Sequence, residues 1–255
     1  MTDTAADANE RSVVWIIGAS TGIGRELALQ MATAGRTVVA SARSRDKLDA
    51  LADDSDGDIR ACPVDVGDPE TLSAAIEMIE SEIGRIDCVI YAAGVWQPMK
   101  MKDFSAATIE TALRINVLGA AHMLELMLPR MRARRSGQIA LVSSVAGYRG
   151  LPLSAAYGSS KAALTHMAEA LRPECDRAGI KLQVISPGFV DTPMTAVNEF
   201  PMPMMITAKA AARHIRRGLN SSAFDIHFPK AFTLQLKLLR LLPYRLYFAI
   251  ARRLG

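Results

Sequence analysis

The stretch Val13–Gly35, VVWIIGASTGIGRELALQMATAG, combines three local patterns in one run. Its first five residues are all apolar, which is typical of a strand buried on both faces of a sheet. Three glycines follow, at positions 18, 22 and 24, and the remaining residues have helical composition up to Gly35. The order of strand, glycine turn and helix predicts the first unit of a parallel α/β sheet.

The glycine turn predicts phosphate binding. Glycines let the backbone turn tightly and approach a pyrophosphate, and the first turn of a helix offers unpaired N–H groups and a positive dipole end. A plain strand-to-helix turn needs one glycine, whereas this turn has three at the spacing of a dinucleotide-binding loop. The residues predicted to surround the phosphates are Gly18, Ser20, Thr21, Gly22, Ile23 and Gly24.

Apolar runs and helical segments alternate along the rest of the chain. Further strands are predicted at 37–42, 59–66, 87–94, 138–143, 181–186 and 224–228, and long helical segments at 68–83 and 105–134. This alternation predicts an α/β fold, a Rossmann-type doubly wound parallel sheet of about seven strands with helices on both faces. Ligands of such sheets bind beyond the carboxyl ends of the strands.

The composition fits one globular domain. The chain has 255 residues, of which 50% are hydrophobic and 22% are charged, and no linker-like segment divides it. We expect a disordered N-terminal tail at 1–11, a single domain at 12–230 and a basic helical extension at 231–255.

Cysteine usage and the N-terminus bear on location. Cys62, Cys88 and Cys175 are unevenly spaced and form no C-x-x-C pair, so we predict no disulfide framework, no metal site and a reducing compartment. Residues 1–12 lack the apolar core of a signal peptide, and no uncharged apolar stretch reaches the roughly 18 residues of a spanning helix. We expect a cytoplasmic protein.

The end of the second strand bears on cofactor choice. An acid at this position is typical of NAD binding, whereas an arginine favours the 2′-phosphate of NADP. Here Ser41 is followed two residues later by Arg43, and no carboxylate occurs before Asp46. We predict NADP(H) in preference to NAD(H), with Arg43 at the phosphate and Ser41 as a hydroxyl donor. Alternatively, Arg43 simply faces solvent at a helix start, as Arg45 and Lys47 do.

Two later strand ends add cofactor contacts. Asp65 is placed to hydrogen-bond an adenine amino group, and Gly94 lets a nicotinamide ribose approach closely. Ala92 and Ala93 before it are small enough to line the same site, although a simple strand end explains them equally well.

Tyr157 and Lys161 stand four residues apart, which places them one turn apart on the same face of a helix. An ammonium beside a phenol lowers its pKa, as proton transfer near neutral pH requires. Ser144 ends the preceding strand and precedes a loop that leads to this helix. A hydroxyl, a phenol and an ammonium so arranged could polarise and protonate a carbonyl.

Asn116 lies in an otherwise apolar helical stretch. It is either a polar residue satisfied by neighbouring backbone or the holder of a water that connects the active-site lysine to solvent. The sequence leaves both interpretations open.

Together these residues resemble the short-chain dehydrogenase/reductase family, whose members are compact single-domain NAD(P)(H)-dependent oxidoreductases. The resemblance covers residues 12–228, nearly the whole chain. The motifs that carry it, in chain order, are Gly18/Gly22/Gly24, Asp65, Gly94, Asn116, Ser144, Tyr157, Lys161, Pro187-Gly188 and Thr192.

The resemblance implies a four-residue catalytic set. Tyr157 is the general acid in reduction and the base in oxidation, and Lys161 lowers its pKa and binds the ribose hydroxyls. Ser144 hydrogen-bonds the substrate oxygen, and Asn116 anchors the relay water. Family members usually form dimers or tetramers, so a homo-oligomer is implied as well.

The resemblance also implies contacts on the nicotinamide side, from the backbone after Pro187-Gly188 and from the hydroxyl of Thr192. We expect Val66 and Val190 to contact the cofactor as well. The chain departs from the family at Tyr91-Ala92-Ala93-Gly94, where the usual turn is Asn-Asn-Ala-Gly. The usual hydrogen bonds of that turn are therefore in doubt.

The segment between Thr192 and Thr207 is rich in methionine and proline. Because methionine adapts to irregular apolar surfaces, we predict an apolar substrate pocket lined by Met194 and Met202, with Trp96 and Met99 as further walls. Alternatively, these methionines pack the loop onto the body of the protein.

Residues 231–255 carry five basic residues and no acid, against a net charge of +4 for the whole chain. Pro243 should divide them into two short helices. A basic, apolar segment with aromatic residues has the composition of one that lies on an anionic lipid surface, here the inner membrane surface. Alternatively, its leucines pack on the core or on a partner subunit. We predict no nucleic-acid binding, because there is no basic stripe elsewhere.

These features predict an NADP(H)-dependent carbonyl reductase or alcohol dehydrogenase that acts on an apolar, lipid-derived substrate. The rival hypothesis is a non-catalytic NADP(H)-binding sensor or scaffold on the same fold, because fold alone does not fix function.

Overall fold

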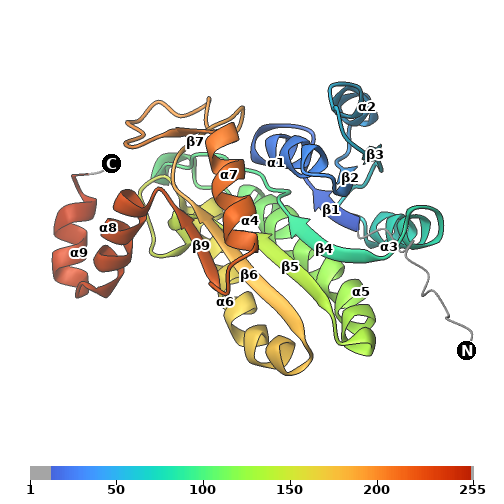
Figure 1. The fold of residues 1–255 in the computed structure, drawn as a ribbon. Coiled ribbons are helices and arrows are strands. Elements are labelled where there is room, and N and C mark those ends of the chain that lie inside the picture. The colour runs from blue at the N-terminus through green and yellow to red at the C-terminus, as the bar shows by residue number, and fades with distance from the viewer. Residues whose placement is uncertain (1–12, 254–255) are drawn as a thin grey trace, which may run out of the picture.

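A computed structural model of the chain describes residues 13–253. The predicted tail at 1–11 lies outside the described residues. One sheet of seven parallel strands, in the order β3-β2-β1-β4-β5-β6-β9, runs through the centre of the molecule (Figure 1). Its strands are β1 (Val13–Ile17), β2 (Thr37–Ser41), β3 (Ile59–Ala61), β4 (Ile86–Tyr91), β5 (Gly137–Val142), β6 (Ile180–Pro187) and β9 (Asp225–Phe228).

Helices cover both faces of the sheet. The longer ones are α1 (Gly22–Thr33), α2 (Arg45–Asp53), α3 (Pro69–Met78), α4 (Ala106–Leu113), α5 (Gly119–Arg134), α6 (Ala155–Arg177), α7 (Ala208–Leu219), α8 (Lys230–Leu241) and α9 (Tyr244–Ala251). Short helical segments are η1 (Ile79–Ile83), η2 (Met101–Asp103), η3 (Arg114–Leu118) and η4 (Val145–Gly147), and a small ribbon pairs β7 (Val190–Asp191) with β8 (Ile206–Thr207).

The alternation of side chains along the strands divides the core into two layers. In β1, Val13, Trp15 and Ile17 belong to the layer under α3, α5 and α6, whereas Val14 and Ile16 belong to the layer under α1, α2 and α7. The side chains of both layers are buried, as expected for parallel strands covered on both faces. The predicted doubly wound α/β fold is confirmed.

Three element predictions need correction. The strand predicted at 59–66 ends at Ala61, and the helix predicted at 105–134 is α4 and α5 joined by the π-helical segment η3. The helix predicted at 68–83 likewise ends in a π-helical segment, η1. The break expected at Pro243 is confirmed, because it separates α8 from α9.

Helices α8 and α9 lie at the β9 end of the sheet (Figure 1). Within residues 13–253, no helix combines the length and apolarity needed to cross a bilayer. The same residues contain no group of His, Cys, Asp and Glu side chains fit to hold a metal ion.

Candidate active site

A groove of about 710 Å³ runs along the carboxyl ends of the strands. The sheet order changes direction between β1 and β4, and in open α/β sheets this is where ligands bind. All residues predicted to contact the cofactor line this groove except Ser41. The strand ends thus bring together positions from Gly18 to Thr192.

The glycine turn forms a tight backbone cradle at one end of this groove. Gly18 has φ +97, and a Cβ there would lie 2.6 Å from the carbonyl carbon of Ala92. A Cβ on Gly24 would lie 2.9 Å from the carbonyl carbon of Gly18, and Gly22 has φ +57 beside Thr192. The backbone contacts at Gly18 and Gly24 exclude any side chain, and the positive φ of Gly22 favours glycine. The turn leaves the start of α1 open to a phosphate. The donors and the groove therefore fit a dinucleotide.

Ser41 is not a cofactor ligand in this structure, contrary to our prediction. Its side chain is fully buried, and its Oγ accepts a hydrogen bond of 2.8 Å from the indole Nε1 of Trp15. Its carbonyl accepts from the backbone N–H of Gly18 at 2.7 Å and of Ala19 at 3.0 Å. The backbone of Ser41 therefore stabilises the start of the glycine turn. No local pattern indicates that the Trp15 indole binds this hydroxyl, because the two residues are 26 positions apart.

Arg43 lines the groove together with Ser44 and Lys47, two residues that the sequence analysis did not assign to it. Lys47 is one turn into α2 and close in sequence to Arg43, so helical spacing could have indicated it. No acidic side chain from this stretch lines the groove. This end of the groove suits an anion.

Asp65 lines the groove, and its Oδ1 accepts a hydrogen bond of 2.9 Å from the N–H of Gly67. The bond orients the carboxylate at the surface of the groove and leaves its other oxygen to a ligand.

Tyr157 and Lys161 lie on the first turns of α6, and both face the groove. The Lys161 ammonium is buried and donates a hydrogen bond of 2.7 Å to the carbonyl of Val142, at the end of β5. It lies 5.5 Å from the centre of the Tyr157 ring. The ammonium is therefore held by the sheet, beside the phenol ring.

The direction of the Tyr157 pKa differs from the sequence prediction. Burial raises the pKa of the Tyr157 phenol to about 12, and only the Ser144 hydroxyl acts in the opposite direction. Burial also lowers the pKa of the Lys161 ammonium to about 8. Loss of hydration dominates both shifts. The phenol is consequently protonated at neutral pH, the form of a proton donor.

Ser144 lies just after the end of β5, and its side chain is near Tyr157. Its Oγ accepts from the N–H of Ala146 at 3.1 Å, which caps η4. Its neighbour Ser143 points elsewhere and donates to the carbonyl of Lys161 at 2.9 Å. Of the two adjacent hydroxyls, only Ser144 is directed toward Tyr157.

Asn116 occupies the centre of η3 and is fully buried. Its Oδ1 accepts from the N–H of Val95 at 2.8 Å, and its Nδ2 donates to the Val95 carbonyl at 3.1 Å and to the Ser160 Oγ at 2.8 Å. The side-chain amide is thus satisfied by backbone and by Ser160, which is the first of the two predicted alternatives. Single π-turns often mark functional sites, and this one fixes the segment beside Gly94.

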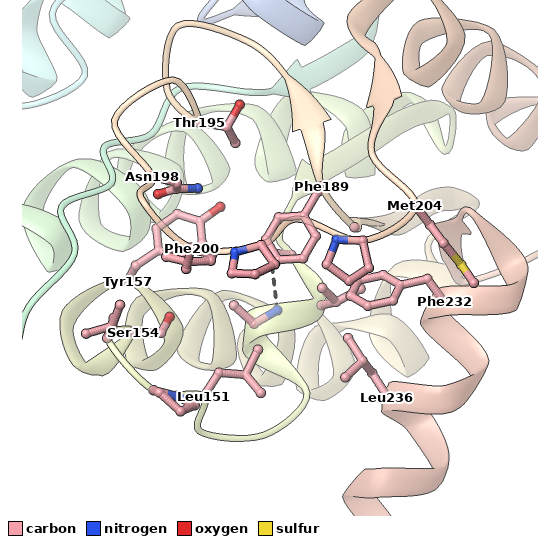
Figure 2. A pocket seen from close by; sticks show the side chains of 18 of the residues that line it. Leu151, Ser154, Tyr157, Phe189, Thr195, Asn198, Phe200, Met204, Phe232 and Leu236 are labelled. Atoms are coloured by element: carbon pink, nitrogen blue, oxygen red, sulfur yellow. Dashed lines mark hydrogen bonds between the residues drawn. The ribbon is translucent and has the colours of Figure 1, made fainter. Parts of the chain in front are cut away.

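A second cavity of about 460 Å³ adjoins the groove, and its walls are mostly apolar (Figure 2). The two spaces share five lining residues, namely Ser144, Tyr157, Gly188, Met194 and Thr195. The phenol and the Ser144 hydroxyl therefore stand where a ligand of the groove meets a ligand of the cavity.

Trp96 and Met194 line the cavity, as predicted. Met202 and Met99 do not line it, contrary to the prediction. Trp96 meets the Tyr157 ring edge-on, with 5.1 Å between centroids, and donates to Asn198 Oδ1 at 2.8 Å. The Met202 sulfur instead accepts from Asn198 Nδ2 at 3.3 Å, behind the cavity wall. Met99 is buried against Ala112 and Ala156.

Most residues of the cavity wall were not predicted from the sequence. One wall is the loop Leu151–Ser154 before α6. Another is formed by Phe189 and Phe200, whose ring centroids are 6.1 Å apart. A further wall is helix α8, which contributes Phe232, Gln235, Leu236 and Leu239. Figure 2 shows Phe232 and Leu236 reaching toward the cavity from this helix. The spacing of these four residues at one helix face was the available signal.

Comparison with known proteins agrees with this arrangement. The family model described as short chain dehydrogenase matches residues 12–200. An uncharacterized oxidoreductase of Myxococcus xanthus is 34% identical over 242 residues, which cover 94% of this chain and 96% of that protein. An uncharacterized oxidoreductase of Staphylococcus epidermidis is 30% identical, over 75% of this chain and 83% of the relative.

Solved structures have the same fold. A short-chain dehydrogenase from Streptomyces avermitilis superposes with a TM-score of 0.81 at 25% identity, covering 95% of this chain and 96% of that one. ElxO, solved with NADP bound, superposes with a TM-score of 0.75 at 24% identity, over 85% and 95% of the two chains. The chain belongs to the short-chain dehydrogenase family and is an oxidoreductase enzyme of that family.

Proposed function

We propose that this enzyme interconverts a carbonyl and a secondary alcohol on an apolar, lipid-derived substrate with NADP(H). One observation carries the proposal: Ser144 and Tyr157 line both the dinucleotide-fitting groove and the apolar cavity. Only a reaction between a ligand of the groove and a ligand of the cavity uses both positions at once. A carbonyl oxygen at this boundary meets a hydroxyl and a protonated phenol.

Each residue has a role that its surroundings support. When bound, the nicotinamide supplies or accepts the hydride. In reduction, Ser144 polarises the substrate oxygen and Tyr157 gives it a proton, and in the alcohol-oxidising direction the same phenolate accepts one. The Lys161 ammonium, fixed by the Val142 carbonyl, faces the ribose side of the groove and stabilises the phenolate after proton transfer. Asn116 positions Val95 and thereby the turn at Gly94.

The preference for NADP(H) rests on charge. Arg43 and Lys47 present two cations at one end of the groove, with the hydroxyl of Ser44 beside them. A 2′-phosphate is favoured by such a cluster, whereas the acid that would bind a free ribose hydroxyl does not occur there. The neighbour ElxO, solved with NADP bound, is consistent with this choice.

The test measures the rate at which the purified enzyme oxidises NADPH or NADH with each of a series of ketone substrates. The ketones range from short and polar to long-chain and steroid-like. We expect turnover with NADPH that rises with apolar length. Tyr157→Phe serves as the inactive control. Turnover confined to short polar ketones contradicts the apolar-substrate part, and a purely NADH-driven signal contradicts the cofactor part.

The rival function is a non-catalytic NADP(H) sensor or scaffold. The buried Lys161 ammonium and the protonated phenol beside it speak against this function, because a binding protein gains nothing from that costly arrangement. Tight NADPH binding without turnover of any ketone or alcohol would favour the rival.

A further inference from the structure

Helix α8 has two apolar faces. Phe232, Leu236 and Leu239 point into the cavity, whereas Leu234, Leu238 and Leu241 are exposed, with Leu241 77% accessible. At about 100° per residue these two sets lie on opposite sides of the helix. The inner face is explained by the substrate cavity, and the outer face has no partner within the described chain.

Most exposed large apolar side chains belong to two segments, helices α8 and α9 and the loop between β7 and β8. Fifteen large hydrophobic residues of the described chain are exposed, and seven of them lie between Leu234 and Ile250. Four more lie on the loop between β7 and β8, two of which, Met194 and Met204, also line the cavity. An apolar surface of this extent commonly marks an interaction site.

The charges on helices α8 and α9 have one sign. Residues 230–255 include no acidic residue. Lys237 pairs with Asp225 at 2.7 Å, but Arg240, Arg245, Arg252 and Arg253 are exposed, and among residues 13–253 no ion pair is formed by the last three. Helices α8 and α9 thus present apolar and cationic side chains together, and this combination complements an anionic lipid interface.

Arg149 connects helices α8 and α9 to the body of the protein. The Arg149 guanidinium donates to the carbonyls of Leu239, Arg240 and Leu242 at 2.6–2.9 Å, which satisfies the C-terminal end of α8. It also stacks on Tyr247 at 4.0 Å. Because Arg149 belongs to the loop between Ser144 and α6, the outer surface and the cavity wall form one preorganised unit.

We propose that helices α8 and α9 dock on the surface of an anionic bilayer, and that the apolar cavity takes its substrate from that surface. The exposed leucines and aromatic side chains enter the headgroup region, and the arginines lie against lipid phosphates. The docking itself is independent of the reaction. The route of the substrate rests on the proposed function.

Flotation with lipid vesicles tests the docking. We expect the full-length protein to float with vesicles of phosphatidylcholine mixed with phosphatidylglycerol, and only weakly with phosphatidylcholine alone. The variant Arg245→Gln/Arg252→Gln/Arg253→Gln should partition about 100-fold less onto the anionic vesicles, since each basic residue near such a surface changes partitioning about fivefold. Leu238→Glu/Leu241→Glu should lose flotation on both. Met101→Glu, at a residue 93% exposed elsewhere, should float like the wild type.

Absence of flotation by the wild type, or flotation unchanged in both the arginine and the leucine variants, overturns the docking. Sedimentation provides the competing readout. If Leu238→Glu/Leu241→Glu instead dissociates an oligomer while the wild type does not float, the surface joins copies of this chain and the proposal is wrong.

Turnover separates this inference from the proposed function. With a water-soluble apolar ketone, Leu238→Glu/Leu241→Glu should match the wild type, whereas with a long-chain ketone held in anionic vesicles it should turn over at least about tenfold more slowly. Equal rates for the vesicle-held ketone overturn the substrate route. A wild type that is inactive on both ketones contradicts the proposed function, and flotation still reports docking.

Discussion

The cofactor groove and the substrate cavity share a boundary but are built in different ways. The groove is formed largely by residues at or just beyond the carboxyl ends of strands β1 to β6, and at Gly18 and Gly24 the backbone itself excludes every side chain. The cavity is formed by loops and by helix α8, whose wall residues are ordinary apolar side chains. The groove thus depends on backbone geometry, whereas the cavity depends on side-chain shape.

This difference shows where substitution should alter chemistry and where it should alter selectivity. A cofactor common to many enzymes is bound by a geometry that tolerates few residues. A substrate particular to one enzyme is bound by packing that many combinations of residues can provide. Tyr157 belongs to both regions, so it should be the most sensitive position.

Tyr157→Phe tests the boundary and should have the largest effect. Loss of the general acid should lower kcat by about 10³-fold, while the Kd for NADPH, measured by fluorescence titration, should change little. A variant that retains most of its activity would remove Tyr157 from the proton-transfer role. Thermal melting should confirm that the variant is folded.

Lys161 tests the groove alone, because it does not line the cavity. Burial lowers the pKa of its ammonium from 10.5 to about 8. The unfolded chain therefore binds more protons between pH 8 and pH 10.5, and the cost of the buried charge disappears as pH rises through this window. We expect Lys161→Met to gain up to about 3 kcal/mol of unfolding free energy relative to wild type below pH 8.

That advantage should vanish near pH 10.5, as measured by denaturant unfolding at several pH values. If the difference in unfolding free energy between Lys161→Met and wild type does not vary with pH, the lowered pKa of the buried Lys161 ammonium is contradicted.

Arg43→Ala tests the phosphate end of the groove. Loss of a charge-assisted contact of about 2 kcal/mol should weaken NADPH binding about 30-fold, with little change for NADH and none in the KM for the ketone. Arg45→Ala is the matched control, since Arg45 pairs with Asp49 at 3.3 Å and does not line the groove. Equal losses for both cofactors would exclude Arg43 from phosphate recognition.

Leu236→Ala tests the cavity alone and should have the smallest effect. The enlarged wall should shift kcat/KM toward bulkier ketones by about tenfold, while NADPH affinity stays unchanged. Leu238→Ala, on the outer face of α8, should leave selectivity as it is. A loss of NADPH binding in Leu236→Ala would show that the two regions are not separable.

The sequence predicted the groove well because backbone requirements leave distinct residues in the chain. The three glycines, Asp65 and the Tyr157–Lys161 spacing were sufficient to place the strand ends that surround it, and the doubly wound sheet followed from alternation alone. The direction of the Tyr157 pKa could not be predicted, because it depends on how completely the phenol and the Lys161 ammonium are removed from water.

Only the tertiary structure decided which side chains face which space. The pattern at the end of β2 predicts Ser41 as a ligand, but its hydroxyl binds the Trp15 indole. The loop composition predicts Met202 as a cavity wall, but its sulfur contacts Asn198 and it does not line the cavity. Helix α8 follows β9 and forms a wall of the cavity. There it lies beside residues such as Trp96 and Ser144, which are far from it in the sequence. The sequence by itself determined the sheet and the cofactor loops through local pattern, whereas the substrate cavity arose from long-range packing that no local pattern encodes.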